Sequence, residues 1–199
     1  MSSSLRIAVA DDEPDMREYL QKVLLRLGHS VVGTAQNGRE LITLCKTFLP
    51  DLVITDIKMP DMDGIEAATE IYKKRPVPVI LISAFHDAEL IARAEADHIM
   101  GYLVKPIKQT DLPPTIALAT RRFEQFQALR QEASNLRQAL EDRKVIEKAK
   151  GILMKRGNMD EQDAFRGLQK MASEKSRKLI DIAQMILVTE ELLSSSNKE

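Results

Sequence analysis

The chain has 199 residues, of which 44% are hydrophobic and 30% charged, and its formal net charge is −1. This composition fits a soluble protein with one full domain and a smaller one. The net charge is too small to attract nucleic acid or a membrane surface to the protein as a whole. The single cysteine, Cys45, excludes a disulfide framework and is expected in the core. The N-terminus shows no signal-peptide pattern and no apolar run could span a bilayer, so we expect a cytoplasmic protein without a membrane partner.

Short apolar segments alternate with segments of helical periodicity in the first half of the chain. The expected strands cover residues 5–10, 31–35, 52–56, 77–82 and 101–104. Apolar residues at helical spacing predict helices near 16–27, 41–48, 65–72 and 88–96. This alternation predicts an α/β fold with a doubly wound, five-stranded parallel sheet and right-handed crossovers.

Polar side chains follow the ends of four of these strands. They are two acids after the first strand, one acid after the third, a hydroxyl and a lysine: Asp11, Asp12, Asp56, Ser83 and Lys105. The carboxyl ends of parallel strands share one edge, and three carboxylates there repel one another unless a cation such as Mg²⁺ joins them. Ser83 and Lys105 would donate to phosphate oxygens, which makes Asp56 a candidate acceptor in phosphoryl transfer. The alternative is that Asp56 is only a turn residue.

These residues resemble the receiver domain of bacterial two-component response regulators over about residues 5–122. The resemblance implies a flavodoxin-like fold, a sensor histidine kinase that phosphorylates Asp56, and a receiver face used for dimerisation. It places Mg²⁺ on Asp12, Asp56 and the main-chain carbonyl of Lys58, with Asp11 reaching the ion mainly through water. It also implies a cis Lys105–Pro106 bond and a switch formed by three residues: Ser83, Ala84 and Tyr102. Tyr102 could instead be an ordinary core aromatic.

A long helix is predicted after Asp111, because Pro113 and Pro114 suit a first helical turn and no Pro or Gly follows until Gly151. Apolar residues at alternating steps of three and four form a seam: Phe126, Leu129, Ala133, Leu136 and Leu140. This seam either pairs two chains in a parallel coiled coil or folds back on the chain's own C-terminal helices. Its regularity favours pairing.

The C-terminal part is predicted to be a small bundle of three helices, with starts near residues 143, 161 and 179. Residues 143–181 contain eleven Lys or Arg against six Asp or Glu, a local excess of +5. Lys144, Lys148, Gly151 and Lys155 share one face of the first helix. From charge alone, this face could track nucleic-acid phosphates or simply be solvated.

The run Ala149-Lys150-Gly151-Ile152-Leu153-Met154, with Ala164-Phe165 and Ile182-Ala183 downstream, resembles the ANTAR domain of transcription antiterminators. The resemblance covers about residues 129–190. It implies a three-helix domain that binds paired RNA hairpins in leader transcripts and favours antitermination. From charge and helix face we expect RNA contacts at Lys144, Lys148, Lys150, Gly151, Lys155 and Arg156. Gly151 would serve either close helix packing or close approach of RNA.

The resulting domain organisation is a receiver at 1–122, a coiled-coil helix at 123–142, an ANTAR domain at 143–193 and a disordered tail at 194–199. We expect a homodimeric, phosphorylation-controlled regulator that binds RNA hairpins rather than DNA. The alternatives are a DNA-binding response regulator with a helix-turn-helix, or a protein-interaction module without nucleic acid. No catalytic constellation follows residue 122, so an enzyme is not expected.

Overall fold

The computed structural model describes residues 4–84 and 99–196, and it divides into two compact units, residues 1–128 and 129–199. The helix predicted at 88–96 lies outside the described residues. No helix within the described ranges is long and apolar enough to cross a membrane.

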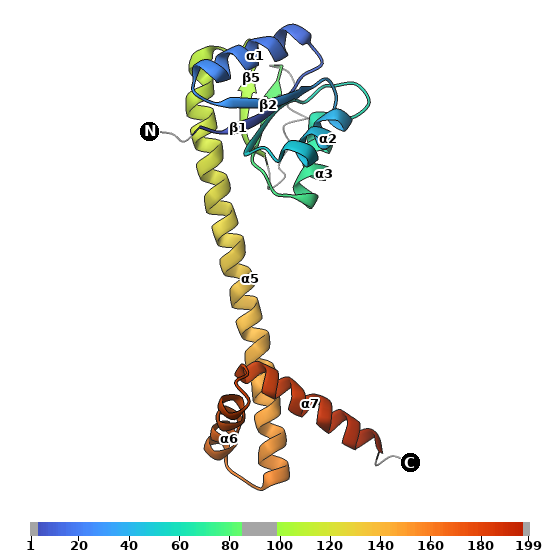
Figure 1. The fold of residues 1–199 in the computed structure, drawn as a ribbon, viewed down its shortest axis with the longest axis vertical. Helices are drawn as coiled ribbons and strands as arrows, with labels where there is room; N and C mark the ends of the chain where they lie inside the picture. Colours follow the sequence, from blue (N-terminus) through green and yellow to red (C-terminus); the bar gives the residue numbers. More distant parts are fainter. Residues whose placement is uncertain (1–3, 85–98, 197–199) are drawn as a thin grey trace. The chain divides into compact units, whose positions relative to one another are not determined.

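A five-stranded parallel sheet forms the centre of the first unit (Figure 1). Its strands are β1 (Arg6–Ala10), β2 (Ser30–Ala35), β3 (Leu52–Asp56), β4 (Val79–Ser83) and β5 (Ile99–Val104). The spatial order is β2-β1-β3-β4-β5. This order reverses direction at β1 and β3, which is where doubly wound sheets place their ligands. The predicted fold class is therefore confirmed.

Helices cover both faces of the sheet. On one face, α1 (Pro14–Arg26) and the start of α5 (Leu112–Gly157) bury a cluster that includes Leu20, Leu24 and Ile116. On the other face, α2 (Gly38–Phe48) and α3 (Gly64–Lys74) pack with Leu41 and Ile71 inward. Strand residues alternate between the two clusters, as the pleat requires, which explains the near-continuous apolar character of β3 and β4.

The helix α5 is 46 residues long and continuous to Gly157. A short 3₁₀ turn, Gln109–Asp111, precedes it, and Pro113 and Pro114 lie in its first turn as predicted. Phe126, predicted as the first seam residue, is partly buried and packs against the receiver core. Within unit 129–199, Leu129, Leu136 and Leu140 are 65%, 60% and 59% exposed. The seam therefore does not fold back on the C-terminal helices.

In the second unit, the end of α5 packs with α6 (Glu161–Glu174) and α7 (Leu179–Ser196). The core is small and is formed by five buried residues: Ala149, Leu168, Ala172, Ile182 and Ala183. The predicted three-helix domain is confirmed. The predicted disordered tail, residues 194–199, overlaps the end of α7, which continues to Ser196. Extending a helix that already exists orders only one residue for each added hydrogen bond.

Candidate functional site

Acidic residues from two strands meet a lysine at one edge of the sheet. Asp11 directly follows β1, Asp56 ends β3, and Lys105 directly follows β5. Nζ of Lys105 lies 2.6 Å from Oδ2 of Asp56 and 3.2 Å from Oδ2 of Asp11. The parallel pairing of β3 with β4 and of β4 with β5 brings these distant residues together. The Lys105–Pro106 bond is cis, as the resemblance implied.

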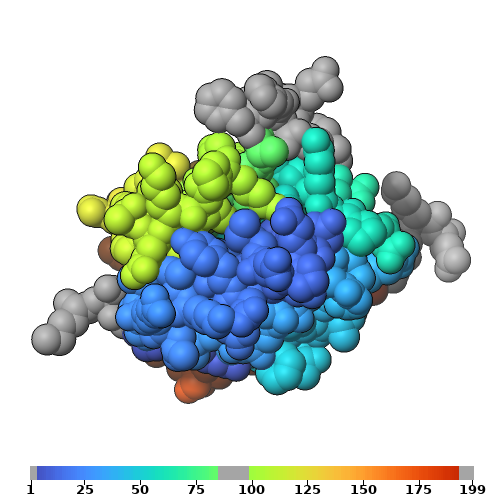
Figure 2. Space-filling view, turned by 90° about the horizontal axis from the view of Figure 1, so that it is seen from above, coloured from blue at the N-terminus to red at the C-terminus, as the bar shows by residue number. Residues whose placement is uncertain are grey.

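Figure 2 shows how the N-terminal segment in blue lies against the yellow-green segment that contains β5 and the start of α5. A hydrogen bond joins the two segments, since the hydroxyl of Tyr19 donates to the main-chain oxygen of Ile107 at 3.0 Å. The position of Lys105 beside the acids is therefore fixed by contacts with α1 as well as by the sheet.

Asp11 is fully buried, and its two carboxylate oxygens have different surroundings. Oδ1 accepts a hydrogen bond from the main-chain N–H of Glu13 at 2.9 Å. Within the described residues Oδ2 receives no hydrogen bond of good geometry, although Lys105 lies near it. Burial raises the pKa of Asp11, and the charge of Asp56 adds to this, while the N–H of Glu13 and Lys105 act against it. A buried carboxylate oxygen without a well-aligned hydrogen bond is a candidate ligand for a cation.

Four carboxylates could share such a cation. Asp11, Asp12, Glu13 and Asp56 each offer an oxygen, and these oxygens all lie within 4.8 Å of one another. Hard carboxylate oxygens at this spacing fit Mg²⁺, which uses one or two carboxylates and keeps several waters. The main-chain N–H of Lys58 donates to Oδ1 of Asp56 at 3.3 Å. The main-chain carbonyl of Lys58, which we expected to be a ligand of Mg²⁺, therefore belongs to the same turn as this carboxylate.

Glu13 was not predicted as a site residue. Its Oε1 lies 3.0 Å from Nζ of Lys105, so it shares the lysine with Asp56. Burial alone would lower the pKa of Lys105, but the hydrogen bonds from its ammonium to Asp56 and Glu13 raise it. The acid after Asp11 and Asp12 was visible in the sequence; its distance from Lys105 depended on the start of α1.

The residues predicted for a switch lie on β4, β5 and the turn after β4. Ser83 is 3% exposed at the end of β4, and its hydroxyl donates to the main-chain oxygen of Ala84 at 3.0 Å. Ala84 is exposed. Tyr102 lies on β5 and is 37% exposed, so its ring is not an ordinary core aromatic in this state.

In the second unit, Lys150, one of the predicted RNA contacts, forms ion pairs within the protein. Its side chain is only 9% exposed and lies between Glu147 and Glu161, at 2.9 and 2.7 Å. Its ammonium also lies 5.8 Å from the centre of the Phe165 ring. The hydrogen bonds to Glu161 and Glu147 raise the pKa of Lys150. Lys150 therefore joins α5 to α6 in this structure.

The other predicted basic residues are exposed. Lys144 pairs with Glu141 on its own helix, and Arg156 pairs with Glu190 on α7. Lys148 and Lys155 line a shallow hollow at Gly151, together with Leu187 of α7. A Cβ at Gly151 would meet no atom within 4 Å outside its own helix backbone. Close helix packing therefore does not explain Gly151.

Comparisons with known proteins agree with this geometry. Residues 7–117 match the family described as "Response regulator receiver domain", and residues 134–187 match "ANTAR domain". The chain is 41% identical over 184 residues to the transcriptional regulatory protein PdtaR of Mycobacterium tuberculosis, which covers 92% of this chain and 90% of that protein.

Two solved structures are similar to the first unit. One is the signal receiver domain of the response regulator NarL from Mycobacterium tuberculosis, at 30% identity and a TM-score of 0.56, covering 60% of this chain and 98% of that one. The other is a response regulator receiver domain protein from Clostridium thermocellum, at 30% identity and a TM-score of 0.55, covering 60% and 96%. The chain belongs to the response regulators in which a receiver domain is followed by an ANTAR domain.

Proposed function

We propose that this response regulator accepts a phosphoryl group from a sensor histidine kinase on Asp56 and, as a dimer, binds paired RNA hairpins to favour antitermination. The observation that carries the proposal is the pairing of Asp56 with Lys105 at 2.6 Å beside the buried Oδ2 of Asp11, which has no well-aligned hydrogen bond. A nucleophilic carboxylate, a fixed cation and a place for a metal ion are the parts that phosphoryl transfer needs.

The roles of the residues follow from their positions. Asp11, Asp12, Asp56 and the carbonyl of Lys58 would hold Mg²⁺, which when bound supplies positive charge for the phosphate oxygens. Lys105 orients the Asp56 carboxylate before transfer. Its ammonium can then move to a phosphate oxygen, because its hydrogen bonds to two carboxylates are exchangeable.

Phosphorylation would act on Ser83 next. The phosphoryl group adds nearly two negative charges beside β4, and these attract the hydroxyl proton of Ser83 away from the oxygen of Ala84. The displaced hydroxyl would leave space for the ring of Tyr102, whose partial exposure leaves it room to move. The surface of β5 and the start of α5 would change, and this is the receiver face expected to pair in a dimer.

RNA binding is assigned to the exposed basic face around Gly151. Lys148 and Lys155 flank the glycine, and the missing side chain leaves a hollow where a phosphate backbone can approach the helix. Lys144 and Arg156 extend this face, whereas Lys150 is removed from it by its two glutamate partners. Dimerisation through Leu129, Ala133, Leu136 and Leu140 would present two such faces, and binding to the second hairpin then becomes intramolecular.

Phosphotransfer is tested by incubating the full chain with labelled acetyl phosphate and Mg²⁺. Asp56→Asn should abolish labelling. Asp61→Asn is the matched control, because Asp61 lies in the turn after β3, is exposed and has a positive φ that Asn also tolerates. Equal labelling of Asp56→Asn and wild type would show that the acceptor is another residue.

RNA binding is tested by gel shift with a two-hairpin RNA, with duplex DNA as competitor. The double variant Lys148→Ala/Lys155→Ala should weaken binding and reduce the slope of log K against log salt by about 0.7 for each lost phosphate contact. Arg166→Ala/Lys170→Ala on α6 is the control of equal charge change. A complex that duplex DNA displaces as well as RNA does would instead indicate a DNA-binding regulator.

A further inference from the structure

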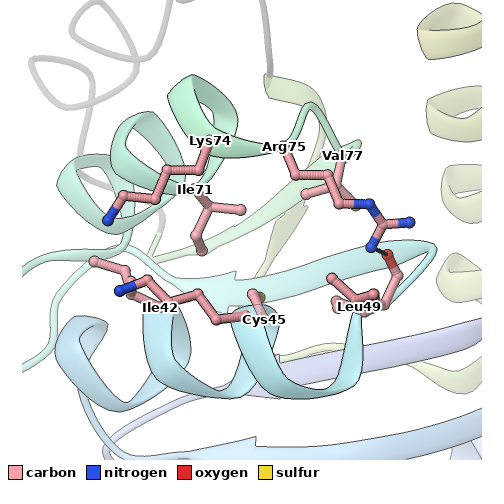
Figure 3. Close-up of a pocket in the computed structure, with 9 residues that line it drawn as sticks. Ile42, Cys45, Leu49, Ile71, Lys74, Arg75 and Val77 are labelled. Atoms are coloured by element: carbon pink, nitrogen blue, oxygen red, sulfur yellow. Dashed lines mark hydrogen bonds between the residues drawn. The ribbon is translucent and has the colours of Figure 1, made fainter.

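A cavity of about 210 Å³ opens between the C-terminal ends of α2 and α3 (Figure 3). Pro50 lies two residues before β3 and Val77 two residues before β4, so the cavity is at the edge of the sheet opposite Asp56. None of the residues assigned above to phosphoryl transfer lines it. A ligand in this cavity would therefore not contact the residues of phosphoryl transfer.

The wall of the cavity is aliphatic. Ile42, Leu49, Ile71 and Val77 provide most of it, and no aromatic ring takes part. The cavity exceeds the roughly 150 Å³ that suffices to bind benzene in an apolar protein interior. With no ring to stack on, an aliphatic chain gains as much from this wall as an aromatic group would.

Leu49, on one side of the cavity, has an unusual backbone conformation. It caps α2 at φ 49 and ψ 64, in the left-handed region where glycine is the usual residue. The leucine is 48% exposed, so it is not kept in this conformation by deep burial of its side chain. Its side chain lines the cavity, and a glycine at this position would remove that part of the wall.

Three cations surround the same cavity, and none of its lining residues is acidic. Lys46 comes from α2, Lys74 from the end of α3, and Arg75 from the residue after it. The guanidinium of Arg75 is fixed by donating to the main-chain oxygen of Pro50 at 3.3 Å. In the described parts of the chain, no carboxylate forms a salt bridge with Lys46 or Lys74, although Glu70 lies one turn before Lys74 on α3.

We propose that this cavity binds a medium-chain fatty acid, with its alkyl chain between Ile42, Ile71 and Val77 and its carboxylate beside Lys46 and Lys74. The combination of an aliphatic interior with an entirely cationic rim matches a ligand that has one apolar body and one negative head. A neutral alkane lacks the head, and a small anion lacks the body.

Binding at this site is non-covalent. Cys45 lines the cavity, but burial raises the pKa of its thiol to about 12, so the nucleophilic thiolate is scarce at neutral pH. The thiol serves as a small apolar wall atom, and the only permanent charges at the site are those of the rim.

The test uses the full chain, octanoate as probe and isoleucine-methyl NMR to localise the ligand. Octanoate should shift the methyl signals of Ile42 and Ile71. Each methylene from butanoate to octanoate should tighten binding about fourfold, and the gain should stop once the chain exceeds the cavity. Octanol should bind more weakly than octanoate, because it lacks the charge that the rim attracts.

Three variants separate the parts of the site. Lys46→Gln and Lys74→Gln should each weaken the binding of octanoate by up to about fivefold and leave the binding of octanol unchanged. Lys73→Gln is the control, because Lys73 lies on the same helix as Lys74 but outside the lining, and it should change the binding of neither ligand. Leu49→Gly suits the backbone, so it should fold, and it should weaken both ligands by about four- to fifteenfold.

Octanoate that shifts only isoleucines of the second unit, or that binds with no dependence on chain length, would overturn the proposal. So would equal binding of octanoate and octanol. Binding of the chain to phosphatidylglycerol vesicles without binding of octanoate would reassign the surface to a lipid membrane. Acetyl-phosphate labelling of Asp56 is measured in the same samples, so failure of the fatty-acid site is distinguished from failure of the receiver.

Discussion

A Cβ atom placed on Gly64 would lie 2.0 Å from the main-chain oxygen of Asp56, the proposed phosphate acceptor. The N–H of Gly64 donates to the oxygen of Ile57 at 2.9 Å, which draws the start of α3 tightly against the end of β3. The glycine is required by this close approach. The strand that carries Asp56 and the helix that follows it could not otherwise turn so sharply.

Gly64→Ala should therefore destabilise the receiver by about 3 kcal/mol or more, since the atom it meets is backbone that cannot rotate away. Any folded fraction should also label poorly with acetyl phosphate, because the shift reaches Asp56 and its 2.6 Å contact with Lys105. Urea denaturation and labelling measure the two effects. Wild-type stability in this variant would mean that the β3–α3 turn relaxes without cost.

Gly151→Ala is expected to have the opposite effect on stability. The glycine lies inside α5 with open space around it, and replacing such a glycine by alanine stabilises a helix by about 0.5–1 kcal/mol. If RNA approaches the helix there, affinity for the two-hairpin RNA should fall while the melting temperature rises. An unchanged affinity would remove Gly151 from the RNA surface.

The sequence predicted the sheet well, because strands buried on both faces are continuous apolar runs and their polar end residues mark one edge. It predicted Lys150 and Phe126 less well. Charge and helix face made Lys150 a candidate RNA contact, and seam spacing selected Phe126. Their contacts in the structure come from residues that neither pattern includes: Glu161 for Lys150 and the receiver core for Phe126. Periodicity places a residue on a helix face but does not show what that face contacts.

The position of Lys150 gives a test of its structural role. Lys150→Met should lower the melting temperature of the second unit slightly, because it removes two ion pairs whose glutamates are more than half exposed. Glu161→Gln should lower it as well, and Lys144→Met, which breaks only an exposed pair with Glu141, should not. A Lys150→Met variant that melts normally but no longer binds RNA would restore Lys150 as an RNA contact.

His29 predicts a pH dependence of receiver stability. Its ring is 8% exposed, its Nδ1 accepts from the main-chain N–H of Leu5 at 3.2 Å, and burial lowers its pKa. In the unfolded chain His29 therefore binds a proton near pH 6.5, whereas in the folded chain it does so only at lower pH. The free energy of unfolding should fall as pH drops below 6.5, by at most about 1.4 kcal/mol per pH unit.

The measurement is urea denaturation between pH 5 and 8 for wild type and His29→Gln. The difference between the two curves isolates His29, because other groups, such as Asp11 with its raised pKa, contribute equally to both. The wild-type curve should lose more stability below pH 6.5 than the variant. Parallel curves would show that His29 titrates alike in the folded and unfolded states.

The exposed seam on α5 predicts dimerisation of the full chain. Leu129, Leu136 and Leu140 are each more than half exposed. Pairing two chains would bury them, and each fully buried leucine would stabilise the dimer by about 1.5–3 kcal/mol. Leu136→Lys should convert a dimer to a monomer in sedimentation equilibrium, because it places two like charges in the seam. Gln138→Lys, on the exposed flank, adds the same charge and should leave the mass unchanged.

Measuring the mass of the wild-type chain with and without beryllofluoride shows whether phosphorylation controls pairing. A wild-type chain that is monomeric in both conditions would leave the apolar seam unexplained by self-association, and the two RNA-binding faces would have to act separately.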